Sequence, residues 1–281
     1  MADERLFEDV EVKKANIRHH NVEAQIFERA HPEGSSVYEK AEVLKSLDFI
    51  AENSGTRDMC VDVGCGTGFV TGFELPMYKI VVSMDISKQM LRTVRNRYGH
   101  ANQLNLVICD AEFLPLRSEI ADLVSVSSVL HHLPKPFRAI TEMSRLLKKG
   151  GFLYATREPN AQRIRRFFDF LDNAIIRKSI GLGQHLHILR LKEFTQSVHI
   201  DVLDYAKADI HYPTGFRVSQ LSSFLEAKSF KIISAYSYHW IYPDPTGGWL
   251  QQLLTRSNLI IGMLPLSKKL GRYVSITARK L

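Results

Sequence analysis

Cysteine is scarce in this 281-residue sequence, and its few copies lack the spacing of a disulfide or zinc framework. Cys60, Cys65 and Cys109 are an odd number, and each lies in or beside an apolar run. We therefore expect three small buried side chains and no metal site.

Long apolar segments are also missing. The stretch LIIGMLPL is far too short to span a bilayer, and the opening MADERLFEDVEVKK lacks the apolar core of a secretory signal. With 45% hydrophobic and 24% charged residues, the composition is that of a globular protein. These features predict a cytoplasmic protein.

Acidic residues are absent after Asp244, although the net charge of the whole chain is only +7. The same segment contains six cationic residues: Arg256, Lys268, Lys269, Arg272, Arg279 and Lys280. Such a segment either faces an anionic surface, such as the inner face of a membrane, or stays solvated. No RNA-binding domain accompanies it, so a nucleic-acid partner is not expected.

The middle of the chain alternates short apolar runs with helical patterns. Runs at 58–63, 79–84, 104–109, 122–127 and 152–156 are rich in Val, Ile and Leu, as strands buried on both faces are. Helices are predicted over 87–97, after Ser87 as N-cap, and over 136–148, opening with Pro136. This alternation predicts a mostly parallel sheet with helices on both faces, which binds ligands at the carboxyl ends of its strands.

The stretch VDVGCGTG, residues 61–68, follows the first predicted strand and should lead into a helix. Its glycines would let a ligand lie against the backbone. However, Phe69 stands where the dinucleotide fingerprint needs glycine, and the phosphate-loop lysine is absent. Asp62 would repel a pyrophosphate but suits a cationic ligand, and Asp85 is placed to accept hydrogen bonds from ribose hydroxyls. A cationic nucleoside fits this pattern.

The ordered motifs VDVGCGTG, MDIS, CDAEFLPL, VSSVLHHL and LLKKGGFLYATREP resemble class I S-adenosylmethionine-dependent methyltransferases of the small-molecule, "type 11" branch. FKIISAYSYHW and YVSITARK resemble the closing strand pair of that family. The resemblance implies an α/β, Rossmann-like, doubly wound sheet. Its seven strands would be mostly parallel, with an antiparallel last strand, and would carry a helical lid and insertions.

The same resemblance assigns roles in binding S-adenosyl-L-methionine. Asp62 would hold the ammonium group of the methionine part, and Asp85 the ribose hydroxyls. Ser127 would lie near the sulfonium. The loop that would pass under the methionine part contains Gly64, Cys65, Gly66 and Gly68. Ile86 would pack on the adenine. The adenine edge would be bound by Asp110, Ala111 and Glu112.

His131 and His132 follow the fourth predicted strand and are the candidate catalytic residues. Either could act as a general base or bind the acceptor, while the alternative is hydrogen bonding within the loop. Enzymes that methylate amino groups of DNA have an NPPY or DPPY tetrapeptide after the fourth strand, where this chain reads SVSS. That activity is therefore not expected.

The organisation expected from these patterns is a helical N-terminal lid over 1–50 and a methyltransferase domain over 51–281. Ser36 and Glu39 have the spacing of a capping box in the lid. Insertions at about 160–215 and 243–271 are expected to select the acceptor. We predict methyl transfer to a small-molecule, glycan or lipid-linked acceptor. The alternatives are an RNA or protein methyltransferase and a non-catalytic partner protein that binds the cofactor.

Overall fold

The structure is a computed structural model, which describes residues 2–31, 34, 36–161, 215–239, 256 and 271–281. The insertions expected at about 160–215 and 243–271 lie outside these residues, apart from their ends. Among the described helices, none is long and apolar enough to cross a membrane.

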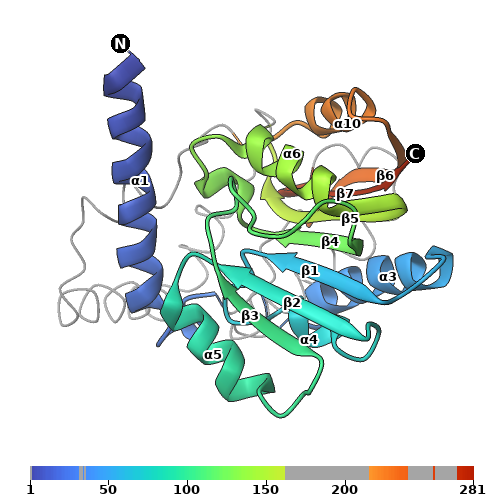
Figure 1. Ribbon diagram of the computed structural model, residues 1–281, viewed down its shortest axis with the longest axis horizontal. Helices are drawn as coiled ribbons and strands as arrows, with labels where there is room; N and C mark the ends of the chain where they lie inside the picture. The colour runs from blue at the N-terminus through green and yellow to red at the C-terminus, as the bar shows by residue number, and fades with distance from the viewer. Residues whose placement is uncertain (1, 32–33, 35, 162–214, 240–255, 257–270) are drawn as a thin grey trace.

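Seven strands form one sheet in the order β3-β2-β1-β4-β5-β7-β6 (Figure 1). Neighbouring strands among the first five run parallel: β1 (Met59–Val63), β2 (Ile80–Asp85), β3 (Leu104–Ile108), β4 (Ala121–Ser127) and β5 (Leu147–Pro159). β7 (Tyr273–Lys280) lies between β5 and β6 (Phe230–Tyr238) and is antiparallel to both. The predicted α/β class and the antiparallel last strand are confirmed.

Helices cover both faces of the sheet (Figure 1). On one face lie α3 (Val37–Asn53), α4 (Thr71–Glu74) and α5 (Lys88–Tyr98), and on the other α6 (Pro136–Leu146) and α10 (Val218–Glu226). The central strands are buried on both sides, so their apolar runs need no polar alternation. The expected domain boundary at residue 50 falls within α3, whose apolar side packs against the sheet.

One helix is shorter than its pattern predicted, and the helix after the glycine loop is a single turn. That helix, α4, ends at Glu74; Leu75 still has helical dihedral angles, but Pro76 has no backbone N–H to continue the helical hydrogen bonds. The helix predicted over 136–148 ends at Leu146, since Leu147 is extended and already pairs with Ala121 at the start of β5.

The capping box expected at the start of α3 is only half present. Ser36 is the N-cap, and its side chain accepts a hydrogen bond from the backbone of Tyr38 at 3.3 Å. The Glu39 carboxylate does not reach back to the cap. It is fully buried and lies 2.9 Å from Nε2 of His239, at the end of β6. The contact with His239, which directly follows β6, thus takes the place of the local hydrogen bond.

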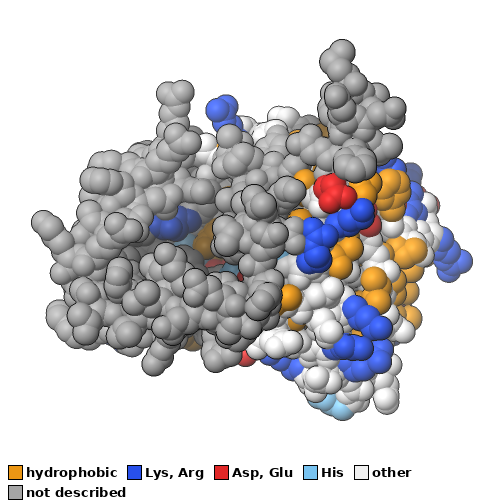
Figure 2. Space-filling model, turned by 90° about the vertical axis from the view of Figure 1, so that its left-hand side faces the viewer, with side chains coloured by type: hydrophobic (Ala, Val, Ile, Leu, Met, Phe, Trp, Pro, Cys, Tyr) orange, Lys and Arg blue, Asp and Glu red, His pale blue; other side chains and the backbone are white. Residues whose placement is uncertain are grey.

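Two cationic side chains of the described C-terminal residues bind backbone carbonyls of the fold. Arg279 donates to the carbonyl of Gly150 at 3.0 Å, and Lys280 donates to the carbonyls of Ser144 and Leu147 at 2.9 and 2.8 Å. Lys280 thereby binds carbonyls at the C-terminal end of α6, where the helix dipole favours a cation. On the side of the molecule that carries α1 (Ala2–Glu23), cationic and hydrophobic side chains of the described residues lie next to one another (Figure 2).

Candidate functional site

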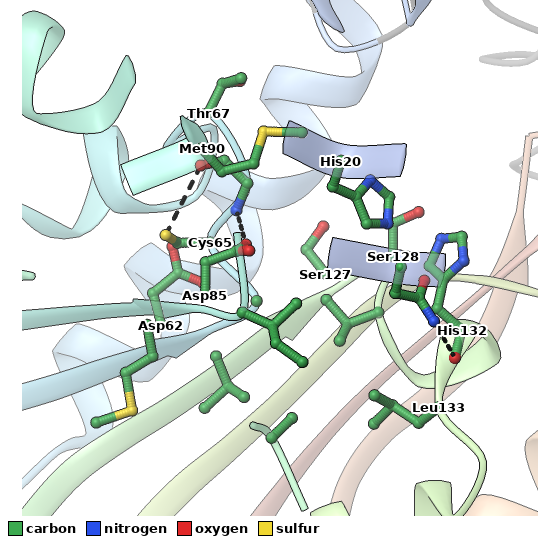
Figure 3. Close-up of a pocket in the computed structure, with 18 of the residues that line it drawn as sticks. His20, Asp62, Cys65, Thr67, Asp85, Met90, Ser127, Ser128, His132 and Leu133 are labelled. Carbon is green, nitrogen blue, oxygen red and sulfur yellow. Dashed lines mark hydrogen bonds between the residues drawn. The ribbon is translucent and has the colours of Figure 1, made fainter. Parts of the chain in front are cut away.

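A cavity lies at the carboxyl ends of β1, β2 and β4, where this type of sheet binds ligands. The glycine loop forms one wall, and the segment after β4, including the short 3₁₀ helix η2 (Leu130–His132), forms another. Residues of α1 line the remaining side (Figure 3). The cavity therefore brings together the motifs that the sequence predicted and a helix of the N-terminal segment that was expected as a lid.

The three glycines of the loop all have positive φ, but they are required for different reasons. A Cβ at Gly64 would lie 2.3 Å from the Val129 side chain, and one at Gly68 would lie 3.0 Å from the Tyr98 ring. At Gly66, with φ of +53°, a Cβ would meet nothing within 4 Å. Gly64 and Gly68 thus permit packing within the protein, whereas Gly66 faces the open space of the cavity.

Asp85 connects the end of β2 to the glycine loop. Its Oδ2 accepts the backbone N–H of Gly66 at 2.9 Å, and its Oδ1 accepts that of Ser87 at 2.7 Å. The carboxylate side chain points towards the loop (Figure 3). Burial raises the pKa of Asp85, and the two backbone donors only partly oppose that shift.

Asp62 lies in β1 beneath the loop and is almost fully buried. Its Oδ2 accepts hydrogen bonds from the backbone N–H and the hydroxyl of Thr71, at 3.0 and 2.6 Å. Burial, with the charge of Asp85 adding to it, raises the pKa of Asp62 to about 6. Asp62 and Asp85 are thus two buried carboxylates at the cavity. Among the described residues, their hydrogen bonds come from backbone N–H groups and from the Thr71 hydroxyl.

The end of the cavity nearest β3 contains Ile86, Asp110 and Ala111. Asp110 is also engaged by the protein, because its Oδ2 accepts from Nζ of Lys13 at 2.7 Å. Glu112 does not line the cavity: its backbone N–H binds Asp110, and its carboxylate binds Lys13 and the backbone N–H of Lys135. Glu112 therefore organises this loop from behind, while Ile86 and Ala111 contact the cavity.

Cys65 and Ser127 also line the cavity, together with Cys109. Burial raises the pKa of the Cys65 and Cys109 thiols, to about 12 for Cys109, so both stay protonated. Cys60 is fully buried within the sheet. The expected role of small packing residues fits all three cysteines, although Cys109 is only partly buried.

Both candidate catalytic histidines line the cavity. Nδ1 of His131 lies 2.8 Å from Oε2 of Glu158, a residue of β5 that is fully buried. The other oxygen of Glu158 accepts the backbone N–H groups of Val129 and Leu130, at 2.8 and 2.9 Å. Because a carboxylate can only accept, a neutral His131 ring would carry its proton on Nδ1, and Nε2 would then be an acceptor.

The sequence analysis did not identify Glu158 as part of the site, and although it expected an N-terminal lid, it named no side chain of α1. Lys13, Asn16, His19, His20 and Glu23 all line the cavity. Asn16 donates to the backbone carbonyl of His132 at 3.2 Å, and the ring of His20 lies edge-on to that of His132, with centroids 5.3 Å apart (Figure 3). The sequence signal for the side chains of α1 is the stretch HHNVE, residues 19–23, in which a glutamate follows the first of two adjacent histidines by four residues.

A family model described as "Methyltransferase domain" matches residues 61–155. The malonyl-[acyl-carrier protein] O-methyltransferase of Methylococcus capsulatus is 35% identical over 95 residues, which are 33% of this chain and 34% of that protein. The ubiquinone biosynthesis O-methyltransferase of Coxiella burnetii is 28% identical over 166 residues, 54% of this chain and 66% of that protein. The first of these matches thus spans about a third of its relative.

Solved structures show the same fold over most of the chain. An N-methyltransferase of Bradyrhizobium japonicum, in complex with S-adenosyl-L-homocysteine, has a TM-score of 0.51 and 13% identity. The alignment covers 87% of this chain and 88% of that one. The fold described above is therefore also that of a methyltransferase whose product complex is known.

Proposed function

Because residues 61–155 form a methyltransferase domain of the class I, type 11 kind, we propose that this protein transfers a methyl group from S-adenosyl-L-methionine to an acceptor. The observation that carries the proposal is the open space at Gly66 directly beside the buried carboxylates of Asp62 and Asp85. A ligand that fills this space and carries both a positive charge and ribose hydroxyls would satisfy all three residues.

The residues present fit the cofactor. Asp62 would accept from its ammonium group, directly or through water, which compensates the buried carboxylate. Asp85 would accept from the ribose hydroxyls while it holds the loop through Gly66. Ile86 and Ala111 would contact the adenine, with Asp110 at its edge, and the Gly64–Gly68 loop would pass beneath the methionine part. Ser127 would lie near the reacting methyl group.

When bound, the cofactor supplies a sulfonium-activated methyl group, which an acceptor atom displaces in line. The protein then has to position the acceptor, exclude water and, where the acceptor carries a proton, remove it. His131 suits this last task, since Glu158 holds its ring and leaves Nε2 able to accept the proton. The ring centroids of His132 and His131 are 4.0 Å apart, and His132 would contact the acceptor.

We propose a small-molecule, glycan or lipid-linked acceptor. The names of the two curated relatives support this class, as one refers to malonyl-[acyl-carrier protein] and the other to ubiquinone biosynthesis. A cytoplasmic location, with contact to a membrane through the basic C-terminal segment, belongs to the same proposal. Lys268 and Lys269 of that segment lie outside the described residues. Sedimentation with anionic vesicles at low and high salt tests the membrane contact.

The test of the function uses the purified protein with methyl-labelled cofactor and fractionated cell extract. We expect label in the organic phase or among small metabolites, and excess S-adenosyl-L-homocysteine should suppress it. Calorimetry with S-adenosyl-L-homocysteine measures binding independently of the acceptor. Label that enters only RNA or protein would overturn the acceptor class, and absence of cofactor binding would overturn the function as a whole.

A further inference from the structure

A group of imidazoles surrounds the carboxylate of Glu23 where α1 faces the cavity. His19 and His20 belong to the same helix, and His31 follows α2 (Phe27–Ala30). Nε2 of His19 lies 3.4 Å and Nδ1 of His20 lies 3.1 Å from Oε2 of Glu23. Nε2 of His31 lies 2.8 Å from the other oxygen, Oε1. The proposed methyl transfer does not require this arrangement.

Nε2 of His19, Nδ1 of His20 and Oε2 of Glu23 have the spacing of ligands around one metal ion. The donor atoms of His19, His20 and Glu23 all lie within 4.8 Å of one another. Zinc bonds of about 2.05 Å that meet at the tetrahedral angle place two ligand atoms roughly 3.3 Å apart. The observed separations of 3.1 and 3.4 Å bracket that value. One ion could therefore contact all three atoms with small side-chain shifts.

The surroundings also match a metal site. Side chains of His19 and Glu23 are only 7% and 10% exposed, so water competes little for their donor atoms. His31 would hold Oε1 while Oε2 binds the ion, and metal-binding carboxylates are commonly oriented by such a second hydrogen bond. Two imidazoles and one carboxylate leave a fourth position open, as in catalytic zinc sites. All four residues line the cavity.

We propose that His19, His20 and Glu23 bind a divalent transition-metal ion of the zinc class, with His31 as the residue that positions the Glu23 carboxylate. Because all three ligands line the cavity that also contains His132, the open coordination position would be reached from that cavity. An oxygen ligand would occupy it, and in the proposed methyltransferase this ligand would be an acceptor oxygen. The acceptor oxygen as fourth ligand rests on the proposed function. The three side-chain ligands do not, because their positions come from the structure alone.

The experiment measures metal binding without cofactor or acceptor. Tag-free protein is stripped with a chelator and titrated with Co²⁺, whose visible absorption reports coordination, and then with Zn²⁺ in competition. We expect one equivalent in the wild type. Glu23→Gln and His20→Ala should lose that binding, and His31→Ala should weaken it by roughly 10- to 100-fold. His100→Ala is the matched control, since it removes an exposed imidazole outside the cavity.

Circular dichroism and thermal unfolding show whether each variant is folded. A wild-type protein that binds no stoichiometric Co²⁺ or Zn²⁺ would overturn the proposal, whatever the variants do. Equal uptake by the wild type and a folded Glu23→Gln variant would overturn it too, and would place any bound ion elsewhere. Neither result affects cofactor binding, which is measured separately, so the metal site and the methyltransferase function can fail independently.

Discussion

Gly66 shows how one residue can be restricted by a ligand rather than by the protein itself. Its neighbours Gly64 and Gly68 are restricted by Val129 and Tyr98, whereas a side chain at Gly66 would extend into the cavity. All three look alike in the sequence. Substitutions at the three positions should therefore differ in whether stability or ligand binding changes most.

We expect Gly66→Val to abolish measurable binding of S-adenosyl-L-homocysteine by calorimetry. The branched side chain would occupy the methionine part of the proposed cofactor space, and positive φ at this position strains a β-branched residue. Gly55→Val is the control, because Gly55 is exposed and also has open space around it, but without positive φ. Wild-type affinity in a folded Gly66→Val protein would mean that the loop does not contact the ligand.

Among the elements, α1 has the most specific attachment to the site. Lys13 binds the carboxylates of Asp110 and Glu112 at 2.7 and 2.6 Å, and Asn21 accepts from the Ser87 hydroxyl at 2.9 Å. The Glu112 side chain is only 2% exposed, so its charge depends on these partners. These contacts hold α1 over the cavity, as a lid would require.

If α1 acts as a lid, Lys13→Met should speed dissociation of bound S-adenosyl-L-homocysteine several-fold in stopped-flow measurements. Each ion pair of this kind contributes about 1 kcal/mol, and the loss also leaves the buried Glu112 carboxylate with one partner fewer. Lys14→Met is the control, because Lys14 is exposed and, among the described residues, pairs with Glu11 of the same helix. Identical dissociation rates in the two variants would contradict the role of α1 as a lid.

For the whole molecule, the buried acids of β1 and its surroundings couple stability to pH. Burial, together with the nearby Asp62 charge, raises the pKa of Glu74, whose Oε1 accepts from the Ser125 hydroxyl at 2.6 Å. The pKa of Asp62 itself is raised to about 6, from an ordinary value near 3.8, chiefly by burial. A raised carboxyl pKa means that the folded protein binds this proton more tightly than the unfolded chain does. The stabilisation is present below pH 4 and is lost as pH rises through 6.

We therefore expect the wild type to lose stability relative to Asp62→Asn as pH rises from 4.5 to 7.5, by on the order of 2 kcal/mol. Asparagine stays neutral and can still accept the hydrogen bonds from Thr71. Urea unfolding of both proteins without cofactor measures the difference, which includes the effect of the Asp62 charge on the pKa of Glu74. If the difference in stability does not change with pH, folding does not shift the pKa of Asp62, and the prediction is wrong.

The sequence alone predicted five strand segments of a mostly parallel sheet, the glycine loop and a ligand cavity at the carboxyl ends of the strands. These features follow from local information: buried strands need apolar runs, and a close turn needs glycine. For the same reason the errors there were small and local, as where the helix predicted over 136–148 ends at Leu146 because Leu147 is extended.

Only the tertiary structure decided which polar side chains meet in the site. Lys13 binds Asp110 across 97 residues, and Glu39 accepts from the Tyr238 hydroxyl across 199 residues, against the local capping pattern. The sequence analysis expected no metal site because it considered only cysteine spacing. His19, His20 and Glu23 are neighbours on one helix, but only the placement of α1 showed that they line the cavity. Local patterns specify backbone conformation, but a buried charge selects its partner from the whole fold, and no local pattern encodes that choice.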